Sequence, residues 1–541
     1  MILKGNIVDV IAKGIFKGEV YVVDGKIEKI VHNDDIEESQ FILPGLIDAH
    51  IHVESSMLIP SEFARLASVH GTVATVSDPH EIANVLGIKG VEFMIENGKK
   101  VPFKFYFGAP SCVPATPFET SGASLDSKDV EDLLSRKEIK YLSEMMNFPG
   151  VLNDDQEVWA KLTAAKKFDK PVDGHAPGLK GEEADKYVKS GITTDHECFT
   201  IPEALDKINS GMFVQIREGS AAKNYHTLSP LIDSHTEHIM LCSDDKHPND
   251  LAKGHIDAII RRALSDGYQL MNILSACILN PVKHYKLEVG LLQVGDPADI
   301  VVIDNLEDFN VLQTYSDGEL IAENGKTLIK SVIEVPINKF YKNDICLDDL
   351  KVEAKGDSFK VIQALDGELI TPLILEKWEG HSPFIESNTA TDVLKIMVLN
   401  RYGKAKPAVA FIKGFGFKKG AIASSVAHDS HNIIAVGVSD EDILKAVLLV
   451  IQEKGGVSWV DGEKSEVLAL PVAGIMSHKN AYEVAEKYDR LDGLAKQLGT
   501  QLHAPYMTLS FMALLVIPEI KLSDKGLFDG NTFSFSNLME N

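Results

Sequence analysis

Two histidines spaced two residues apart are the first side chains in this chain whose type and spacing could perform chemistry. His50 and His52 follow an apolar run at 42–47, which the pattern predicts to be a buried strand. In extended chain, residues i and i+2 point to the same side, so both imidazoles would face one point in space. Two ligands of one metal ion require this arrangement. The alternative is a pair of histidines in a surface loop.

The chain beyond this pair predicts the element that would position them. From 42 to 284, β-rich runs alternate with helical stretches such as 154–167 and 181–189. Eight strand–helix units are what a (β/α)8 TIM barrel of about 250 residues requires. A doubly wound sheet is the structural alternative, since alternation alone does not separate the two folds. The eight predicted strands are 42–48, 71–77, 103–107, 139–143, 171–173, 191–194, 212–216 and 238–243.

Ionisable and imidazole side chains gather at the C-terminal ends of nearly all of these predicted strands. The N-terminal ends are instead mostly apolar or glycine. Because barrel enzymes place their chemistry at the C-terminal ends of the strands, this asymmetry favours the TIM barrel over the doubly wound sheet. In chain order, the side chains are His50, His52, Asp78, His80, Glu81, Glu144, His175, His196, Glu197, Arg217, Glu218, Asp244 and Asp245.

Six of these side chains combine imidazoles with carboxylates, a donor set that suits Zn, Mn or Fe(II). Five or six ligands are too many for one open tetrahedral site, but they suit two metals that share Glu144 and a hydroxide. Such a pair would lower the pKa of bound water. Asp244 could hold a metal, take the proton of the nucleophilic water and pass it to a leaving nitrogen. The six are His50, His52, Glu144, His175, His196 and Asp244.

Composition favours an enzyme acting on a small molecule. The chain has 541 residues, 45 % of them hydrophobic, and a net charge of -25. Such acidity disfavours coating of nucleic acid. The five scattered cysteines, without a Cys-x-x-Cys motif, fit reduced thiols in the cytoplasm. The sequence has neither a signal-peptide pattern at its start nor an apolar run near the ~20 residues that a membrane span needs. We therefore expect a cytoplasmic protein that binds neither nucleic acid nor membrane.

Several segments together resemble the amidohydrolase superfamily. They are Pro-Gly-Leu-Ile-Asp-Ala-His-Ile-His at 44–52, Val-Asp-Gly-His at 172–175, Thr-Asp-His-Glu at 194–197, Cys-Ser-Asp at 242–244 and Gly-Asp-Pro-Ala-Asp-Ile-Val at 295–301. Within the superfamily, four further segments resemble the bacterial and archaeal adenine deaminase family, so that the resemblance spans the whole chain. They are His-Ile-His-Val-Glu-Ser-Ser-Met at 50–57, Val-Ser-Asp-Pro-His-Glu at 76–81, Ser-Glu-Met-Met-Asn at 143–147 and Ala-His-Asp-Ser-His-Asn at 427–432.

The resemblance implies hydrolysis of adenine to hypoxanthine and ammonia in purine salvage, with a binuclear Mn(II) or Fe(II) centre and Zn as a further candidate. It implies that His50, His52 and Asp244 ligate the first metal, that Glu144 bridges, and that two later histidines ligate the second. Those two are His175 and His196. Many superfamily members bridge their metals with a carboxylated lysine on strand 4. Lys140 lies earlier on the same face of that strand, but we favour Glu144.

The resemblance also implies that Asp78 and Glu81, in a loop beyond strand 2, contact the purine. Carboxylates can accept the N–H groups of adenine, and N1 must gain a proton as water adds at C6. A protonated carboxylic acid could supply that proton. Glu81 and Glu144 both stay open for this role, so the predicted catalytic residues are Asp244, Glu144 and Glu81.

Other side chains near the predicted site have structural alternatives. Asp245 would act behind Asp244 or cap a helix, and His80 would be a structural hydrogen bonder. Glu54 would be either an acid behind the ligands or an exposed loop residue. Arg217 and Glu218 would pair with each other, and Glu197 would be a turn residue unless it contacts substrate. The histidines of 428–431 would stabilise a local loop, form another metal site, or close the barrel mouth.

Around the barrel we expect two further domains. Residues 1–40 read as short antiparallel strands with a hairpin turn at Asp24-Gly25, and strand patterns return after 289. This predicts an α/β protein built from a barrel at 42–284, a small discontinuous β-sandwich domain at 1–41 plus 285–340, and a C-terminal α+β domain at 350–541. A linker is expected at 351–356.

Three functions compete. The first is a metal-dependent aminohydrolase acting on adenine. The second is a cyclic amide hydrolase, similar to a dihydropyrimidinase or an allantoinase, which would favour lysine on strand 4. The third is a catalytically inactive scaffold, against which the complete ligand set argues. We expect a homodimer or a higher homo-oligomer, because barrels of this kind often associate.

Overall fold

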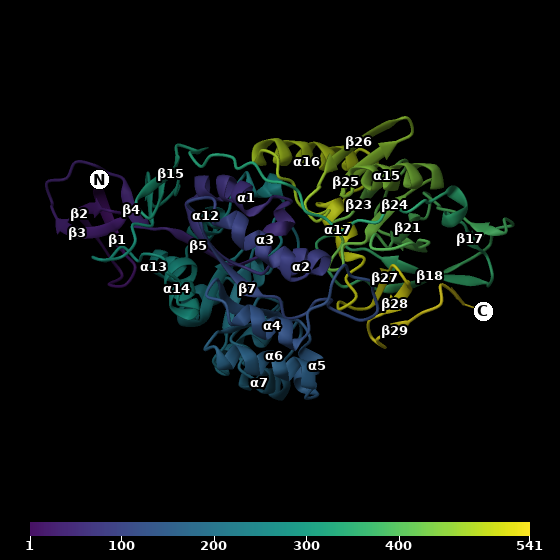
Figure 1. Ribbon diagram of the computed structural model, residues 1–541, viewed down its shortest axis with the longest axis horizontal. Coiled ribbons are helices and arrows are strands. Elements are labelled where there is room, and N and C mark those ends of the chain that lie inside the picture. Colours follow the sequence, from purple (N-terminus) through teal and green to yellow (C-terminus); the bar gives the residue numbers. More distant parts are fainter. Residues whose placement is uncertain (541) are drawn as a thin grey trace.

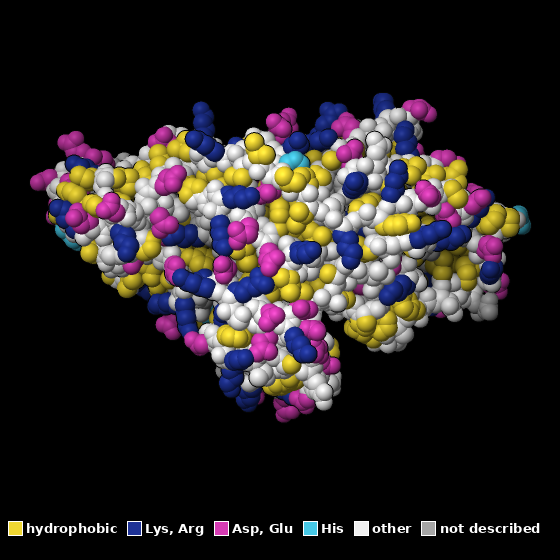
Figure 2. Space-filling model, viewed as in Figure 1, with side chains coloured by type: hydrophobic (Ala, Val, Ile, Leu, Met, Phe, Trp, Pro, Cys, Tyr) yellow, Lys and Arg dark blue, Asp and Glu magenta, His cyan; other side chains and the backbone are white. Residues whose placement is uncertain are grey.

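Three bodies follow one another along the longest axis of the molecule (Figure 1). They are a small β-sheet body near the N-terminus, a central barrel and a C-terminal α/β unit. The computed structural model describes residues 1–540. No helix in this part of the chain is both long and apolar enough to cross a membrane. On the face shown in Figure 2, basic and acidic side chains are interspersed.

The small body is one sheet of eight strands drawn from both sides of the barrel sequence. Asp24 and Gly25, both at positive φ, make the predicted hairpin between β2 and β3. A bridge between Lys26 and Pro297 curls the sheet around its own apolar core. The strands are β1 Ile2–Asp9, β2 Gly14–Val23, β3 Lys26–His32, β4 Phe41–Pro44, β13 Ile300–Ile303, β14 Val311–Ser316, β15 Glu319–Glu323 and β16 Lys326–Thr327.

The central body confirms the predicted TIM barrel. Its eight strands pair in parallel in chain order, and the Asp244 N–H donates to the His50 carbonyl at 2.9 Å where the last strand meets the first. The C-terminal ends of all eight strands therefore face one mouth. The strands are β5 Leu46–Ile51, β6 Thr72–Ser77, β7 Lys104–Ala109, β8 Ile139–Met145, β9 Val172–Gly174, β10 Thr194–Asp195, β11 Phe213–Arg217 and β12 Ile239–Cys242.

Helices alternate with these strands and cover the outside of the barrel (Figure 1). Of the two helical stretches named from the sequence, 181–189 matches α7, and 154–167 begins two residues before α6. The helices are α1 Pro60–Ala67, α2 His80–Leu86, α3 Ile88–Gly98, α4 Ser127–Leu134, α5 Phe148–Leu152, α6 Gln156–Lys167, α7 Gly181–Lys189, α8 Ile201–Asn209, α9 Tyr225–Leu228, α10 Leu231–Ser234, α11 Pro248–Leu251, α12 Ile256–Ser265, α13 Leu270–Leu274 and α14 Asn280–Tyr285.

The first predicted strand, 42–48, is wrong as a single element. The chain changes sheets at Gly45, so that β4 belongs to the small sheet and β5 to the barrel. A Cβ atom at Gly45 would lie 2.3 Å from the Val73 side chain, which explains why glycine occupies this crossing. Because β5 extends to Ile51, His50 lies inside the strand and only His52 lies beyond it.

The C-terminal unit centres on a nine-stranded mixed sheet. Helix α15 is Asp440–Glu453, α16 is Ala481–Lys496 and α17 is Pro505–Phe511. The strands of the unit are β17 Val352–Glu353, β18 Ser358–Gln363, β19 Leu373–Lys377, β20 Phe384–Ile385, β21 Val393–Leu399, β22 Ala408–Lys413, β23 Ala421–Ser424, β24 Ile433–Gly437, β25 Gly456–Asp461, β26 Lys464–Ala469, β27 Ile520–Ser523, β28 Gly526–Asp529, β29 Ser534–Phe535 and β30 Met539–Glu540.

The linker expected at 351–356 is wrong. Strand β17 lies there and pairs with β20 inside the C-terminal unit. The segment that connects the small sheet to this unit is 328–346, which contains neither helix nor strand. We propose that the three bodies are the domains expected from the sequence at 1–41 plus 285–340, 42–284 and 350–541, with the first limit moved to Gly45 because β4 belongs to the small sheet.

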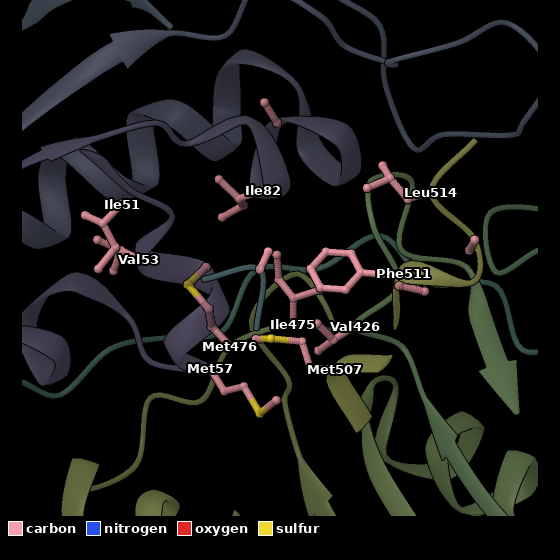
Figure 3. Packing of buried hydrophobic residues seen from close by; sticks show 14 of the residues in the cluster. Ile51, Val53, Met57, Ile82, Val426, Ile475, Met476, Met507, Phe511 and Leu514 are labelled. Atoms are coloured by element: carbon pink, nitrogen blue, oxygen red, sulfur yellow. The ribbon is translucent and has the colours of Figure 1, made fainter. Parts of the chain in front are cut away.

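The barrel and the C-terminal unit share one apolar core. Figure 3 shows residues from the end of β5, from the segment that follows it and from α2, packed against residues of the C-terminal unit. A continuous core of this kind disfavours independent motion of the two units. Its labelled members are Ile51, Val53, Met57 and Ile82 from the barrel, and Val426, Ile475, Met476, Met507, Phe511 and Leu514 from the C-terminal unit.

One buried carboxylate ties the ends of the barrel sheet together. Asp48 on β5 accepts the Ser243 N–H at 3.0 Å and also the Ser243 hydroxyl, and its Oδ2 lies 2.8 Å from His255 Nε2. His255 precedes α12, so a single side chain connects the first strand, the end of the last strand and a helix.

We expect Asp48→Ala to lower the free energy of unfolding by about 2–5 kcal/mol, because it leaves several buried polar groups without partners, each worth roughly 1–3 kcal/mol. Chemical denaturation followed by circular dichroism would measure the loss. Asp34→Ala, at an exposed aspartate, is the matched control and should change stability by no more than about 0.5 kcal/mol. Equal stability of the two variants would contradict this account of barrel closure.

Candidate active site

The two carboxylates predicted as metal ligands, Asp244 and Glu144, both lie at the barrel mouth and both face imidazoles. Asp244 Oδ1 is 3.6 Å from His50 Nε2 and 3.2 Å from His52 Nε2. One carboxylate oxygen thus faces two imidazole nitrogens.

Glu144, near the end of β8, lies between the two pairs of histidines. Its Oε2 is 2.9 Å from His175 Nδ1 and 3.1 Å from His196 Nε2, and its Oε1 is 3.4 Å from His52 Nε2. The rings of His50 and His196 stack with centroids 4.2 Å apart, which joins the two halves of the cluster. All six residues predicted as ligands are therefore brought together.

The donor atoms fit one or more divalent cations. Among the described residues, both ring nitrogens of His50, Nε2 of His175 and Nδ1 of His196 are buried and have no hydrogen-bond partner. Groups of these residues offer ligand atoms that all lie within 4.8 Å of one another, including His50 with His196 and Asp244, and Glu144 with His175 and His196. Buried imidazole nitrogens directed at shared carboxylate oxygens are what a metal centre of N and O ligands requires.

The charges of the cluster also favour a cation. Burial lowers the pKa of His50, but its contacts with Asp173 and Asp244 outweigh burial and raise the pKa to about 10. Burial likewise lowers the pKa of His175, yet Glu197 and Glu144 raise it to about 9. The carboxylates thus generate a negative potential at the imidazoles, which a divalent cation would neutralise.

Arg217 holds Asp244 from behind. Its guanidinium donates to Asp244 Oδ2 at 2.6 Å and to both carboxylate oxygens of Glu197. Burial raises the pKa of Asp244, but Arg217 and the facing histidines hold it well below its usual value. The predicted pairing of Arg217 with Glu218 is wrong: Glu218 pairs with Arg262 at 3.0 Å. Glu197 is buried in this network rather than exposed in a turn.

Asp78 and Glu81 lie near one another but face different groups. Asp78 is buried behind His80, with its Oδ2 3.0 Å from His80 Nδ1, and is not part of the cavity wall. Glu81, in the first turn of α2, does line the cavity. His80 also lies 3.4 Å from Glu144 Oε1, so it contacts the cluster as well as Asp78.

The histidines of 428–431 contact a carboxylate of the barrel. His428 Nδ1 lies 2.5 Å from Glu81 Oε1, and His431 Nε2 contacts Glu81 Oε2. Local hydrogen bonds are also present, as expected: the Ala427 N–H donates to His431 Nδ1 at 3.2 Å and the His431 N–H donates to the Ala427 carbonyl at 2.7 Å. Burial lowers the pKa of His428, but Glu81 and Asp245 raise it to about 9. This loop brings the C-terminal unit onto the barrel mouth.

The cluster surrounds a cavity of about 30 Å³, room for roughly two water molecules. Ligand side chains line one side, and residues of the C-terminal unit line the other. A ring compound larger than this volume would require part of the wall to move. The C-terminal wall consists of Leu369, His428, Asp429, Phe511, Leu514 and Val516.

Sequence reasoning missed Asp429 and the apolar wall. Asp429 stood inside a motif already singled out, so its acidic side chain between two histidines was the available signal. Burial raises the pKa of Asp429 to about 6. Nothing in the local pattern around Phe511 or Leu514 distinguished them from ordinary core residues.

Three further residues considered from the sequence lie at different distances from the cluster. Lys140 is at the opposite end of the barrel, 3.9 Å from Glu288 and away from the cluster. Asp245 Oδ1 accepts the Ser55 hydroxyl at 2.5 Å and lies beside the cavity behind Asp244. Glu54 is buried, not exposed, and accepts the Ile82 N–H at 3.2 Å, while burial raises its pKa to about 7.

Comparisons with known proteins agree along the chain. Residues 41–321 match the model of the amidohydrolase family, and residues 368–534 match that of the adenine deaminase C-terminal domain. The chain is 56 % identical over 537 residues to an adenine deaminase of Sulfurovum sp., with 99 % of each chain covered. It is 52 % identical over 550 residues to an adenine deaminase of Methanosarcina mazei, covering 99 % of this chain and 98 % of the relative. Identity to an adenine deaminase of Salinibacter ruber is 51 % over 535 residues, with 98 % of each covered.

We expect the protein to retain Mn(II) through dialysis and the variants His52→Ala and His196→Ala each to retain less than half as much. Mutation of a residue that only hydrogen-bonds to a ligand typically lowers metal affinity about 10- to 100-fold. Loss of the ligand itself should lower the affinity at least as much. Elemental analysis of the dialysed proteins measures the content. His284→Ala, a histidine 3.0 Å from Thr193 before β10, is the control and should keep the full content. Unchanged metal content in both variants would contradict the assignment of His52 and His196 as metal ligands.

Proposed function

The chain belongs to the amidohydrolase family and, within it, to the adenine deaminases, and on that basis we propose how its side chains hydrolyse adenine to hypoxanthine and ammonia. One observation carries the proposal beyond the family: four buried imidazoles converge on Glu144 and Asp244 at the barrel mouth. This convergence provides a metal site and a proton carrier in one place.

A divalent metal is implied by the family and by the fit of the donor atoms. We propose two Mn(II) or Fe(II) ions, with Zn as the further candidate. His50, His52 and Asp244 would hold the first ion, His175 and His196 the second, and Glu144 both. When bound, such ions polarise the substrate and lower the pKa of a coordinated water.

Asp244 is the proposed proton shuttle. Its Oδ1 faces the cavity side of the cluster, while Arg217 fixes Oδ2 at 2.6 Å and so fixes the direction of the carboxylate. From this position Asp244 can take a proton from the attacking water and deliver it to the nitrogen that leaves as ammonia. The proton balance closes, because one proton of the water ends on the departing amine and the other, lost as the C6 hydroxyl becomes a carbonyl, replaces the proton given to N1.

Glu81 and Glu144 are the candidates for protonating N1 of the ring. Both carboxylates line the cavity, and both contact histidines that can replace a donated proton. Asp78 supports the site through His80 and would not touch the purine unless that histidine moved.

The alternatives have less support. A cyclic amide hydrolase would favour a lysine at the mouth end of strand 4, whereas Lys140 is at the far end of the barrel and Glu144 faces the histidines. An inactive scaffold would have no need of six assembled ligands. We also propose a role in purine salvage and a cytoplasmic location, which the five free cysteines support.

A homodimer or higher homo-oligomer is part of the same proposal. Apolar side chains including Ile2, Ile11, Ile15 and Val23 are exposed on the small sheet and offer a surface for association. Light scattering at micromolar concentration would detect an assembly of two or more chains, and a monomer would contradict it.

We expect the Mn(II)-loaded protein to release ammonia from adenine, but to release little from adenosine and not to open dihydrouracil. Coupled detection of ammonia and chromatography of hypoxanthine measure the reaction. Ring opening of dihydrouracil without deamination of adenine would favour the cyclic amide hydrolase. No reaction with any of the three substrates at full metal loading would favour the inactive scaffold.

We expect Asp244→Ala to lower kcat for adenine by about 10³-fold or more, because proton transfer by a positioned side chain typically contributes 10²–10⁴-fold and the residue is also a proposed ligand. Circular dichroism should show the fold unchanged. The exposed Asp34→Ala serves as the control with wild-type activity. Full activity in Asp244→Ala would eliminate it as the shuttle.

A further inference from the structure

A carboxyl group from the C-terminal unit faces the cavity opposite the metal ligands. Asp429 is buried and lines the cavity, and among the described residues its Oδ2 has no hydrogen-bond partner. Its Oδ1 lies 4.0 Å from His80 Nε2 and 4.0 Å from His428 Nδ1, beyond hydrogen-bond distance of either. A buried polar atom without a partner is costly unless a ligand or water completes it.

The loop that carries Asp429 is held on both sides. The Arg401 Nε–H donates to the His431 carbonyl at 2.5 Å, and the Tyr402 hydroxyl donates to the Ser430 carbonyl at 2.6 Å. Asn432 Nδ2 donates to the Thr120 carbonyl of the barrel at 2.9 Å. These bonds hold the loop backbone immediately after Asp429, while the carboxyl group itself keeps its hydrogen-bonding capacity for a ligand.

Beside Asp429 the cavity wall contains two rings and two aliphatic side chains. The rings of His428 and Phe511 stack at 5.0 Å, with Leu514 and Val516 next to them in the wall. Figure 3 shows Phe511 and Leu514 extending from the C-terminal unit toward the side of Ile82. An aromatic, planar ligand suits such a wall, and its edge would then reach the carboxyl group.

One imidazole ring separates Asp429 from Glu144. His80 Nδ1 is 3.4 Å from Glu144 Oε1, and His80 Nε2 is 4.0 Å from Asp429 Oδ1. A bicyclic purine whose reacting carbon lies beside Glu144 would extend along the His80 ring toward Asp429. Its five-membered ring would then lie toward Asp429.

We infer that Asp429 accepts a hydrogen bond from the N9–H of adenine and thereby selects the free base over the nucleoside. The inference rests on the proposed deamination of adenine and adds its specificity determinant. A nucleoside has no N9–H and carries a sugar at that position, so it would both lose the bond and meet the carboxyl group. The C-terminal unit thus supplies a substrate-binding residue.

The test compares adenine with 9-methyladenine, which lacks the N–H, in the Mn(II)-loaded wild type and in Asp429→Asn. In Asp429→Asn the amide oxygen can still accept the N9–H, but the bond loses its charge, so KM for adenine should rise about 10-fold, with kcat changed less. The effect on 9-methyladenine should be within about threefold, because that substrate never made the bond. Asp429→Ala, which also makes room for the methyl group, should bring the two substrates closer together.

Asp461→Asn is the matched control, since Asp461 pairs with Lys419 on the surface of the same unit. It should retain wild-type KM for both substrates. Metal content and circular dichroism are measured on every variant, because Asp429 could alternatively join His80 and Glu81 in holding a metal ion.

The outcomes separate the two proposals. A wild type that does not deaminate adenine overturns the proposed function and this inference together. An active wild type with unchanged KM in Asp429→Asn overturns the inference alone. Equal losses on both substrates would make Asp429 structural, and reduced metal content would make it a ligand; either result overturns the inference. If Asp429→Asn fails to fold, Asp429→Ala gives the comparison between the two substrates. A wild type with equal KM for adenine and 9-methyladenine would also overturn the inference.

Discussion

Two buried carboxylates that share their oxygens among four imidazoles are the interaction on which the rest of the structure depends. Glu144 contacts His52, His175 and His196, and Asp244 contacts His50 and His52. Groups of this kind, desolvated at the end of a barrel, are stable together only when their charges and donors are matched. A divalent cation matches them, and the parallel strands bring all six ligands to one mouth.

The barrel fixes this cluster from behind. Asp48 joins the first strand to the end of the last, next to Asp244, and Arg217 bridges Asp244 and Glu197. These contacts determine where the ligand side chains start and in which direction they point. The position of the ligands therefore depends in part on Asp48, which does not line the cavity.

The C-terminal unit completes the site from the other side. Its apolar core is continuous with that of the barrel, and His428 and His431 each contact one carboxylate oxygen of Glu81. The cavity that remains is smaller than a purine, so binding must displace part of this wall. Since the core is continuous, the movement is more consistent with local displacement of the wall around Phe511 and Leu514 than with separation of the two units.

How far the sequence predicts this structure depends on the range of the interaction. The barrel and its six mouth residues were predictable because strand periodicity is local and parallel strands end at one edge. The change of sheet at Gly45 was not, because a continuous apolar run hides which sheet each half joins. The partners of Arg217 and Glu81 were also hidden. Arg217 bonds to residues 20 and 27 positions away, and Glu81 meets His428 across 347 positions. Contacts that close a fold across such separations leave no local pattern.

The most direct measurement of the central claim is a titration of the metal-free protein with Mn(II), following ammonia release from adenine at each addition. We predict negligible ammonia release from the metal-free protein. The rate should then rise in proportion to bound metal, up to about two ions per chain. Turnover of adenine by the metal-free protein at the rate of the loaded protein would contradict the central claim, because the clustered imidazoles and carboxylates would then have another purpose.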